Sequence, residues 1–231
     1  MKRIYLFLLL PLLIGCNQKQ KIESSDSVSE SEQASETPKP SESLESSESE
    51  EEPDTRERVT STITFRNSGF TTSTFEKDAT QNSFIAWFNN HENADGLLTS
   101  ITYDNSNYYA QMNYIGNEGD ANRFSTLILG SQSKNGLIKF NFAYPIESVT
   151  CTVQAYSKYI SYSDSYSVDT NSVFNLNQTS QNLSLSNGYS GPTEEVQVNA
   201  TINPEAANFS ISSTGGRVFV HEMVITYLGD N

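Results

Sequence analysis

Residues 148–155 read SVTCTVQA, and their apolar side chains occupy every second position: Val149, Cys151, Val153 and Ala155. Successive side chains of an extended strand point to opposite faces of a sheet, so these four lie on one face. Such alternation is typical of an antiparallel strand with one buried face and one more polar face. The segment therefore predicts a half-buried strand within a larger antiparallel sheet.

The same two-residue period recurs from Val59 onward, most clearly in residues 137–142, 195–202 and 217–227. Further short strands are expected at Ile63 and Phe65, Phe124 to Leu129, Val173 to Leu176, Leu183 and Leu185, and Phe209 and Ile211. Asn-Gly, Gly-Pro and Gly-Gly turns separate these candidates, and residues 83–90 fit either a short helix or a strand. About ten strands predict an all-β fold, with two antiparallel sheets packed as a sandwich over residues 58–231.

Residues 127–142, LILGSQSKNGLIKFNF, are similar to a Gly-Ser-Ser-x-x-x-Gly-x-hydrophobic pattern in jelly-roll modules of low-GC Gram-positive surface proteins. In those modules a strand like residues 146–156 follows, and a closing strand like residues 217–227 ends the module. The resemblance covers residues 97–228. It implies a jelly-roll-like, galactose-binding-like β-sandwich and carries no catalytic signature.

The chain begins like a bacterial export signal. Lys2 and Arg3 precede an apolar run at residues 4–14, which is too short for a spanning helix of about 20 residues. The run ends in Leu-Ile-Gly-Cys at residues 13–16, which resembles the lipobox of bacterial lipoproteins. The resemblance implies that residues 1–15 are removed as a signal peptide and that Cys16 carries a diacylglyceryl group. Two acyl chains give a stable anchor, so we expect a palmitate-containing lipoprotein on the extracellular face of the cell membrane.

Residues 16–57 continue from this cysteine as a Ser/Glu-rich segment. Residues 17–57 hold 13 acidic and four basic residues and almost no apolar ones. A segment of this composition cannot bury enough apolar surface to offset its ordering entropy, and its like charges keep it extended. We therefore expect a disordered acidic tether between the anchor and the sandwich.

Composition and motifs narrow the possible functions of residues 58–231. Fifteen acidic and eight basic residues make a poor surface for phosphate backbones, so we expect no nucleic-acid partner. The chain has no zinc, phosphate-loop, dinucleotide or serine-hydrolase motif. His91 lacks the surrounding ligands of a metal-dependent nuclease, and Cys151 on an apolar face is expected to be an inert buried thiol. His221 is expected to pack on the face that carries Phe219, Met223, Ile225 and Tyr227.

Loop aspartates raise the question of a metal ion. Asp95, Asp104, Asp120 and Asp164 offer the oxygen ligands that calcium prefers, but their spacing matches no calcium loop. We expect no cofactor, and a structural calcium ion remains the open alternative.

Tyrosines are the most informative candidates for a binding site. A tyrosine combines a flat apolar ring with a hydroxyl group and loses little entropy on binding, which suits stacking on sugars or contacts with proteins. The ordinary alternative is cross-strand pairing within a sheet. The candidate ligand-binding residues are Tyr108, Tyr109, Tyr156, Tyr159, Tyr162 and Tyr166.

Three functional interpretations follow. The first, which we favour, is a non-catalytic binding module for a glycan or protein ligand. The second is a structural or accessory envelope lipoprotein that packs on a partner protein. The third is a glycoside hydrolase that uses two carboxylates, which the fifteen acidic residues leave open. No catalytic constellation can be assembled from the sequence, so we expect that the protein is not an enzyme.

Overall fold

The computed structural model describes residues 56–203 and 205–229. The predicted signal peptide at residues 1–15, the lipidated Cys16 and the predicted tether up to residue 55 lie outside the described residues.

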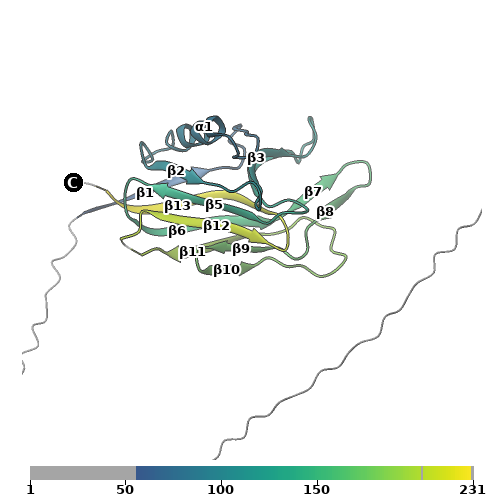
Figure 1. The fold of residues 1–231 in the computed structure, drawn as a ribbon. Coiled ribbons are helices and arrows are strands. Elements are labelled where there is room, and N and C mark those ends of the chain that lie inside the picture. The colour runs from purple at the N-terminus through teal and green to yellow at the C-terminus, as the bar shows by residue number, and fades with distance from the viewer. Residues whose placement is uncertain (1–55, 204, 230–231) are drawn as a thin grey trace, which may run out of the picture. The chain divides into compact units, whose positions relative to one another are not determined.

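The described residues form one helix and thirteen strands (Figure 1). In chain order they are β1 (Glu57–Thr64), α1 (Asp78–Phe88), β2 (Leu98–Thr102), β3 (Ala110–Ile115), β4 (Phe124–Leu129), β5 (Gly136–Phe142), β6 (Ile146–Ala155), β7 (Ser157–Ile160), β8 (Ser165–Val168), β9 (Val173–Leu176), β10 (Thr179–Asn182), β11 (Glu195–Thr201), β12 (Asn208–Thr214) and β13 (Val218–Gly229). The ambiguous residues 83–90 lie mostly in α1.

Two antiparallel sheets account for most of these strands. The six-stranded sheet has the order β11-β6-β13-β4-β3, with β1 also paired to β13, and the five-stranded sheet has the order β10-β9-β12-β5-β2. Consecutive strands alternate between sheets in β4-β5-β6 and β11-β12-β13, as in a jelly roll. The predicted all-β, two-sheet antiparallel sandwich is confirmed. Strands β7 and β8 form a separate hairpin.

The core lies between the two sheets because each sheet turns its alternating apolar side chains toward the other. Val149, Cys151 and Val153 are buried there, as the period of residues 148–155 predicts. Helix α1 adds Phe84 and Phe88, which lie four residues apart on one helix face and pack on Phe140 of β5. Within the described ranges, no helix has the length and apolarity needed to cross a bilayer.

A β-bulge in β13 changes which face its side chains occupy. The register of β13 against β6 shifts between Val220 and Glu222. Val220 and Met223 both belong to the main core, whereas Phe219 belongs to a separate small cluster. The predicted shared face of Phe219, His221, Met223, Ile225 and Tyr227 is therefore wrong, because one extra residue reverses the alternation.

The pairing of β1 with β13 shows which residues lie at each end of the six-stranded sheet. Glu57 pairs with Gly229, and Thr64 pairs with Glu222. The Phe219 end of β13 therefore lies beyond the far end of β1. The eight residues of β1 span roughly 26 Å. The start of β1 and the region around Phe219 therefore lie at least that far apart along the sheet.

Candidate functional site

The outer face of the six-stranded sheet, which points away from the five-stranded sheet, carries its own small apolar cluster. Ile115, Ile128, Tyr156 and Phe219 are buried there, with Phe124 packed against them. Phe124 meets Phe219 edge to face, with ring centroids 5.4 Å apart. Outer faces of antiparallel sheets are normally more polar, so this cluster marks a region that other parts of the chain cover.

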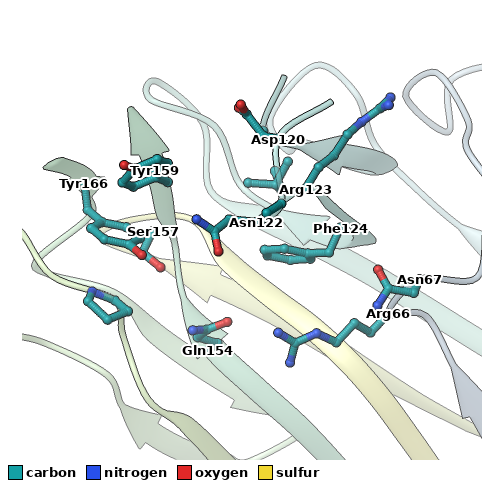
Figure 2. Close-up of a pocket in the computed structure, with 14 residues that line it drawn as sticks. Arg66, Asn67, Asp120, Asn122, Arg123, Phe124, Gln154, Ser157, Tyr159 and Tyr166 are labelled. Atoms are coloured by element: carbon teal, nitrogen blue, oxygen red, sulfur yellow. The ribbon is translucent and has the colours of Figure 1, made fainter. Parts of the chain in front are cut away.

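A cleft of about 290 Å³ opens beside this cluster. Figure 2 shows Tyr159 and Tyr166 on one side of it and Arg66 and Asn67 on the other, with Gln154 between them. We call it the outer-face cleft. Its lining residues are Arg66, Asn67, Ile115, Gly116, Asp120, Ala121, Asn122, Arg123, Phe124, Gln154, Ser157, Tyr159, Tyr166 and Pro192.

The β7–β8 hairpin supplies the aromatic wall. Tyr159 and Tyr166 are direct cross-strand partners, and their rings meet edge to face with centroids 5.3 Å apart. The Tyr159 hydroxyl donates a hydrogen bond to Asp164 Oδ1 at 2.5 Å. This bond to a carboxylate favours the protonated phenol and so raises the pKa of Tyr159. The pair thus keeps its rings and its hydroxyl in a fixed arrangement beside the cleft.

The loop between β3 and β4 forms another wall, from Gly116 to Arg123. Gly116 has φ +97°, and a side chain there would lie 3.2 Å from the Arg123 Cα, so the loop needs glycine at this position. Asp120 Oδ2 accepts a hydrogen bond from the Asn117 N–H at 3.0 Å. These contacts hold the loop in a shape that presents Asn122 to the cavity, as Figure 2 shows.

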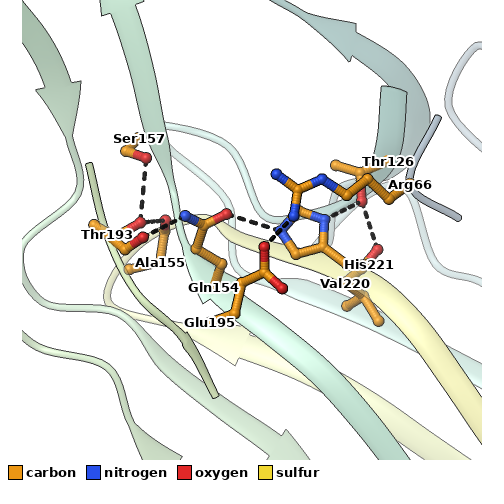
Figure 3. Close-up of polar contacts among 9 residues, drawn as sticks. All are labelled: Arg66, Thr126, Gln154, Ala155, Ser157, Thr193, Glu195, Val220 and His221. Atoms are coloured by element: carbon orange, nitrogen blue, oxygen red, sulfur yellow. Dashed lines mark hydrogen bonds and ion pairs between the residues drawn. The ribbon is translucent and has the colours of Figure 1, made fainter. Parts of the chain in front are cut away.

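A buried polar network lies behind the cleft and fixes Gln154 (Figure 3). Gln154 Nε2 donates to the Thr193 carbonyl at 2.5 Å, which turns Gln154 Oε1 toward His221 Nε2 at 2.8 Å. His221 Nε2 must therefore carry a proton. His221 Nδ1 lies 3.1 Å from the hydroxyl of Thr126. Both ring nitrogens thus lie within hydrogen-bond distance of a protein group, although the Thr126 hydroxyl also donates to the Val220 carbonyl at 2.6 Å.

The protonation state of His221 follows from its burial. Burial disfavours the imidazolium and lowers its pKa from 6.5 to about 4; Arg66 adds to this effect and Glu195 opposes it. At neutral pH the ring is uncharged, with the proton on Nε2. The same network continues past Thr193, whose hydroxyl donates to the Ala155 carbonyl at 2.6 Å and lies 3.2 Å from Ser157 Oγ. Gln154 is therefore a rigid part of the cleft.

Two arginines line the cleft, and their guanidinium groups contact different partners. Arg66 forms an ion pair with Glu195 and places its guanidinium 5.1 Å from the centroid of the Phe124 ring. Arg123 lies 4.0 Å above the Tyr114 ring. Its Nε is buried and, within the described part of the chain, has no hydrogen-bond acceptor. The cleft therefore combines aromatic faces with amide and guanidinium donors.

The structure separates the six predicted tyrosines. Tyr159 and Tyr166 line the outer-face cleft, while Tyr162 lies at the hairpin turn with 92% of its surface exposed. Tyr156 is buried under Arg217, whose guanidinium lies 3.3 Å from its ring centroid. Tyr156 and Tyr109 line a second hollow on the same face.

Tyr108 lines neither hollow, and it contacts its neighbours through its backbone. It forms a β-bridge with Asn135, and its carbonyl accepts a hydrogen bond from the Tyr103 hydroxyl at 3.0 Å. The structure thus brings two of the six tyrosines together in the cleft and places two more beside it.

The other predicted residues lie apart from the cleft or have structural partners. Cys151 is buried in the core, and burial raises the pKa of its thiol well above its ordinary value. His91 Nδ1 lies 3.0 Å from the Phe88 carbonyl, and its ring contacts Trp87 edge to face. Both arrangements are those of packed structural residues.

Three of the four aspartates considered as calcium ligands, Asp104, Asp120 and Asp164, accept local hydrogen bonds. Asp104 accepts hydrogen bonds from the Ser106 N–H and the Asn107 amide, and Asp164 accepts one from Tyr159. Among residues 56–203 and 205–229, no three acidic, histidine or cysteine side chains gather as a metal site would require.

Sequence reasoning missed Arg66, Asn122, Arg123 and Gln154. Gln154 occupies the polar side of the 148–155 alternation, where the pattern favours exposure, yet it is buried and hydrogen-bonded to Thr193 and His221. Isolated polar residues at strand ends carry no periodic signal. Residues 58–231 contain only eight basic residues. This scarcity is the one sequence feature that could have drawn attention to Arg66 and Arg123.

Comparison of the chain with protein-family models gave no match, and a search of curated proteins found no similar sequence.

Proposed function

We propose that this protein is a lipid-anchored surface protein whose sandwich binds a glycan, without catalysis, in the outer-face cleft. The observation that carries the proposal is the placement of the Tyr159–Tyr166 pair beside Gln154 and Asn122 in one cavity. Sugars present apolar ring faces between hydroxyl groups. Aromatic rings pack on the former, and amide groups donate to and accept from the latter.

The shape and rigidity of the cleft support the same proposal. Its volume lies near the lower end of the roughly 300–1,000 Å³ typical of small-molecule pockets. Gln154 is fixed from behind by His221 and Thr193, so a ligand does not have to order it. A preformed donor and acceptor lowers the entropic cost of binding.

Binding is favoured over hydrolysis because of the carboxylates. Asp120 is the only acidic residue that lines the cleft in the described part of the chain. Glu195, which lies nearby, is committed to an ion pair with Arg66. Glycoside hydrolases ordinarily use two carboxyl groups on either side of the scissile bond.

The position of the cleft supports a role at the cell surface. The cleft lies near Arg66, just past the end of β1, whereas the predicted tether enters β1 at Glu57. These points lie at opposite ends of the strand, roughly 26 Å apart. A domain held through Cys16 by that tether would therefore be joined to its anchor at the end away from the cleft.

The glycan proposal is tested with the full chain in detergent on a glycan array. We expect binding to a defined set of glycans, and loss of about tenfold in affinity in Tyr159→Ala and in Tyr166→Ala, because each removes one stacking surface. Tyr162→Ala is the matched control, since Tyr162 lies on the same hairpin outside the cleft. Equal binding by all three variants would place the ligand elsewhere.

The anchor is tested separately by radiolabelled palmitate in the native host. We expect Cys16→Ala to abolish label incorporation and to release the protein from the membrane fraction. Label that persists in the variant contradicts the proposed anchor and leaves the cleft unaffected.

A second candidate is an accessory role in which the hairpin contacts a partner protein. Tyr162 favours it, because a tyrosine with 92% of its surface exposed is available for a protein contact. In that case crosslinking in the native envelope would capture one partner, and Tyr162→Ala would abolish capture while Tyr159→Ala would not.

A further inference from the structure

A second hollow of about 400 Å³ lies on the same outer face, next to the outer-face cleft. Strand β3 contributes Gln111 and Asn113 to it, the loop after β4 contributes Gln132, and Tyr109 and Tyr156 add rings. Its chemistry thus repeats that of the cleft, with amide groups beside aromatic surfaces.

The two hollows are adjacent. Ile115 lines both of them. The consecutive residues Tyr156 and Ser157 line one hollow each, where β6 passes into β7. The ring of Tyr156 and the side chain of Ile115 also belong to one buried cluster, so the boundary between the hollows is a packed apolar ridge rather than a loose loop.

The wall of the second hollow is fixed by an ion pair. Arg217 contacts Asp169 through Nε at 2.7 Å and Nη2 at 2.8 Å, and its guanidinium covers the Tyr156 ring at 3.3 Å. A bidentate arginine–carboxylate pair of this kind holds both planes in place. Arg217 and Tyr156 therefore form a preorganised wall of the second hollow.

We infer that the ligand is a glycan chain long enough to occupy both hollows, so that recognition requires an oligosaccharide rather than a single terminal sugar. This inference rests on the proposed function. Each hollow alone is near the small end of the range for ligand pockets, whereas two hollows joined at Ile115 offer consecutive sugar units separate contacts. When one glycan chain occupies both hollows, the two contacts contribute to a single binding free energy. The translational and rotational entropy of the glycan is then lost only once.

The test is calorimetric titration of the full chain in detergent with ladders of glucose, galactose and N-acetylglucosamine oligomers, from monosaccharide to hexasaccharide. We expect affinity to rise by about tenfold or more along the ladder that binds. Gln111→Ala and Asn113→Ala should reduce hexasaccharide affinity and leave the affinity for the shortest bound sugar unchanged. Gln178→Ala is the control, because Gln178 lies in the β9–β10 turn outside both hollows.

The outcomes separate the two proposals. Equal affinity for short and long oligomers, with Gln111→Ala and Asn113→Ala unchanged and Tyr159→Ala impaired, would overturn the extended ligand and keep glycan binding in the cleft. No binding of any oligomer, or binding insensitive to Tyr159→Ala and Tyr166→Ala, would overturn both.

Discussion

The two faces of the six-stranded sheet are both buried near the Phe219 end of β13, but for different reasons. On the inner face, Val153, Val218 and Val220 pack towards the other sheet, and all belong to one continuous apolar core. On the outer face, Phe219 belongs to a separate small apolar cluster, and His221 beside it is hydrogen-bonded to Gln154.

The difference shows how a single strand serves stability and recognition at once. The opposing sheet and helix α1 contribute the apolar side chains that pack on the inner face. Loops cover the outer face only in part, which leaves two hollows and requires a hydrogen-bond partner for each buried polar group. The bulge between Val220 and Glu222 places His221 on this second face.

Shortening a buried side chain should lower the free energy of unfolding most on the inner face. Ile225→Ala removes a fully buried side chain between the sheets, and we expect it to lower the free energy of unfolding by about 4 kcal/mol. Ile128→Ala on the outer face should cost about 2 kcal/mol, because its smaller cluster can relax toward the hollows. Urea denaturation measures both. Equal losses would show that the outer face is packed as tightly as the core.

Acidification should affect the outer face through His221. Its folded pKa of about 4 lies below the ordinary 6.5, so between these values only the unfolded chain binds the proton. The free energy of unfolding should therefore fall as pH decreases from 6.5 to 4, by roughly 3 kcal/mol from this group, with no further loss below that window. Urea denaturation across this range checks the effect. His221→Gln should be less stable at neutral pH but should lack this contribution to the slope; an unchanged slope would contradict it.

Two of the ion pairs should differ according to how deeply their side chains are buried. Asp169→Asn leaves the mostly buried Arg217 without its carboxylate and should cost about 2 kcal/mol. Glu147→Gln disrupts the more exposed pair with Arg58 and should cost less than about 1 kcal/mol. Thermal unfolding compares them. A larger loss for Glu147→Gln would contradict the assignment of Arg217 as the rigid wall of the second hollow.

The smallest effect is expected at the hairpin turn. Tyr162→Ala removes a side chain with 92% of its surface exposed, so the urea midpoint should not change measurably. A clear loss of stability would show that the Tyr162 ring packs against the protein in solution.

Much of the fold was predictable from the sequence, and less of the candidate site. Alternation in residues 148–155 correctly places Val149, Cys151 and Val153 in the core, because side-chain period and burial are linked within one strand. The same reasoning failed at Phe219 and His221, since a bulge of one residue is invisible in an apolar pattern. It also treated the tyrosines of residues 156–166 as one group, although Tyr156 is buried and Tyr162 is exposed.

The sequence alone determined the two-residue period, the turns and hence the antiparallel sandwich, because these depend on contacts within and between neighbouring strands. It also contained the export, lipobox and tether patterns, which stay predictions. Only the tertiary structure decided that Arg66, Asn122, Gln154 and Tyr159 line one cleft. Their positions come from the segment after β1, the β3–β4 loop, β6 and β7, and no local pattern encodes how such distant segments converge on one face.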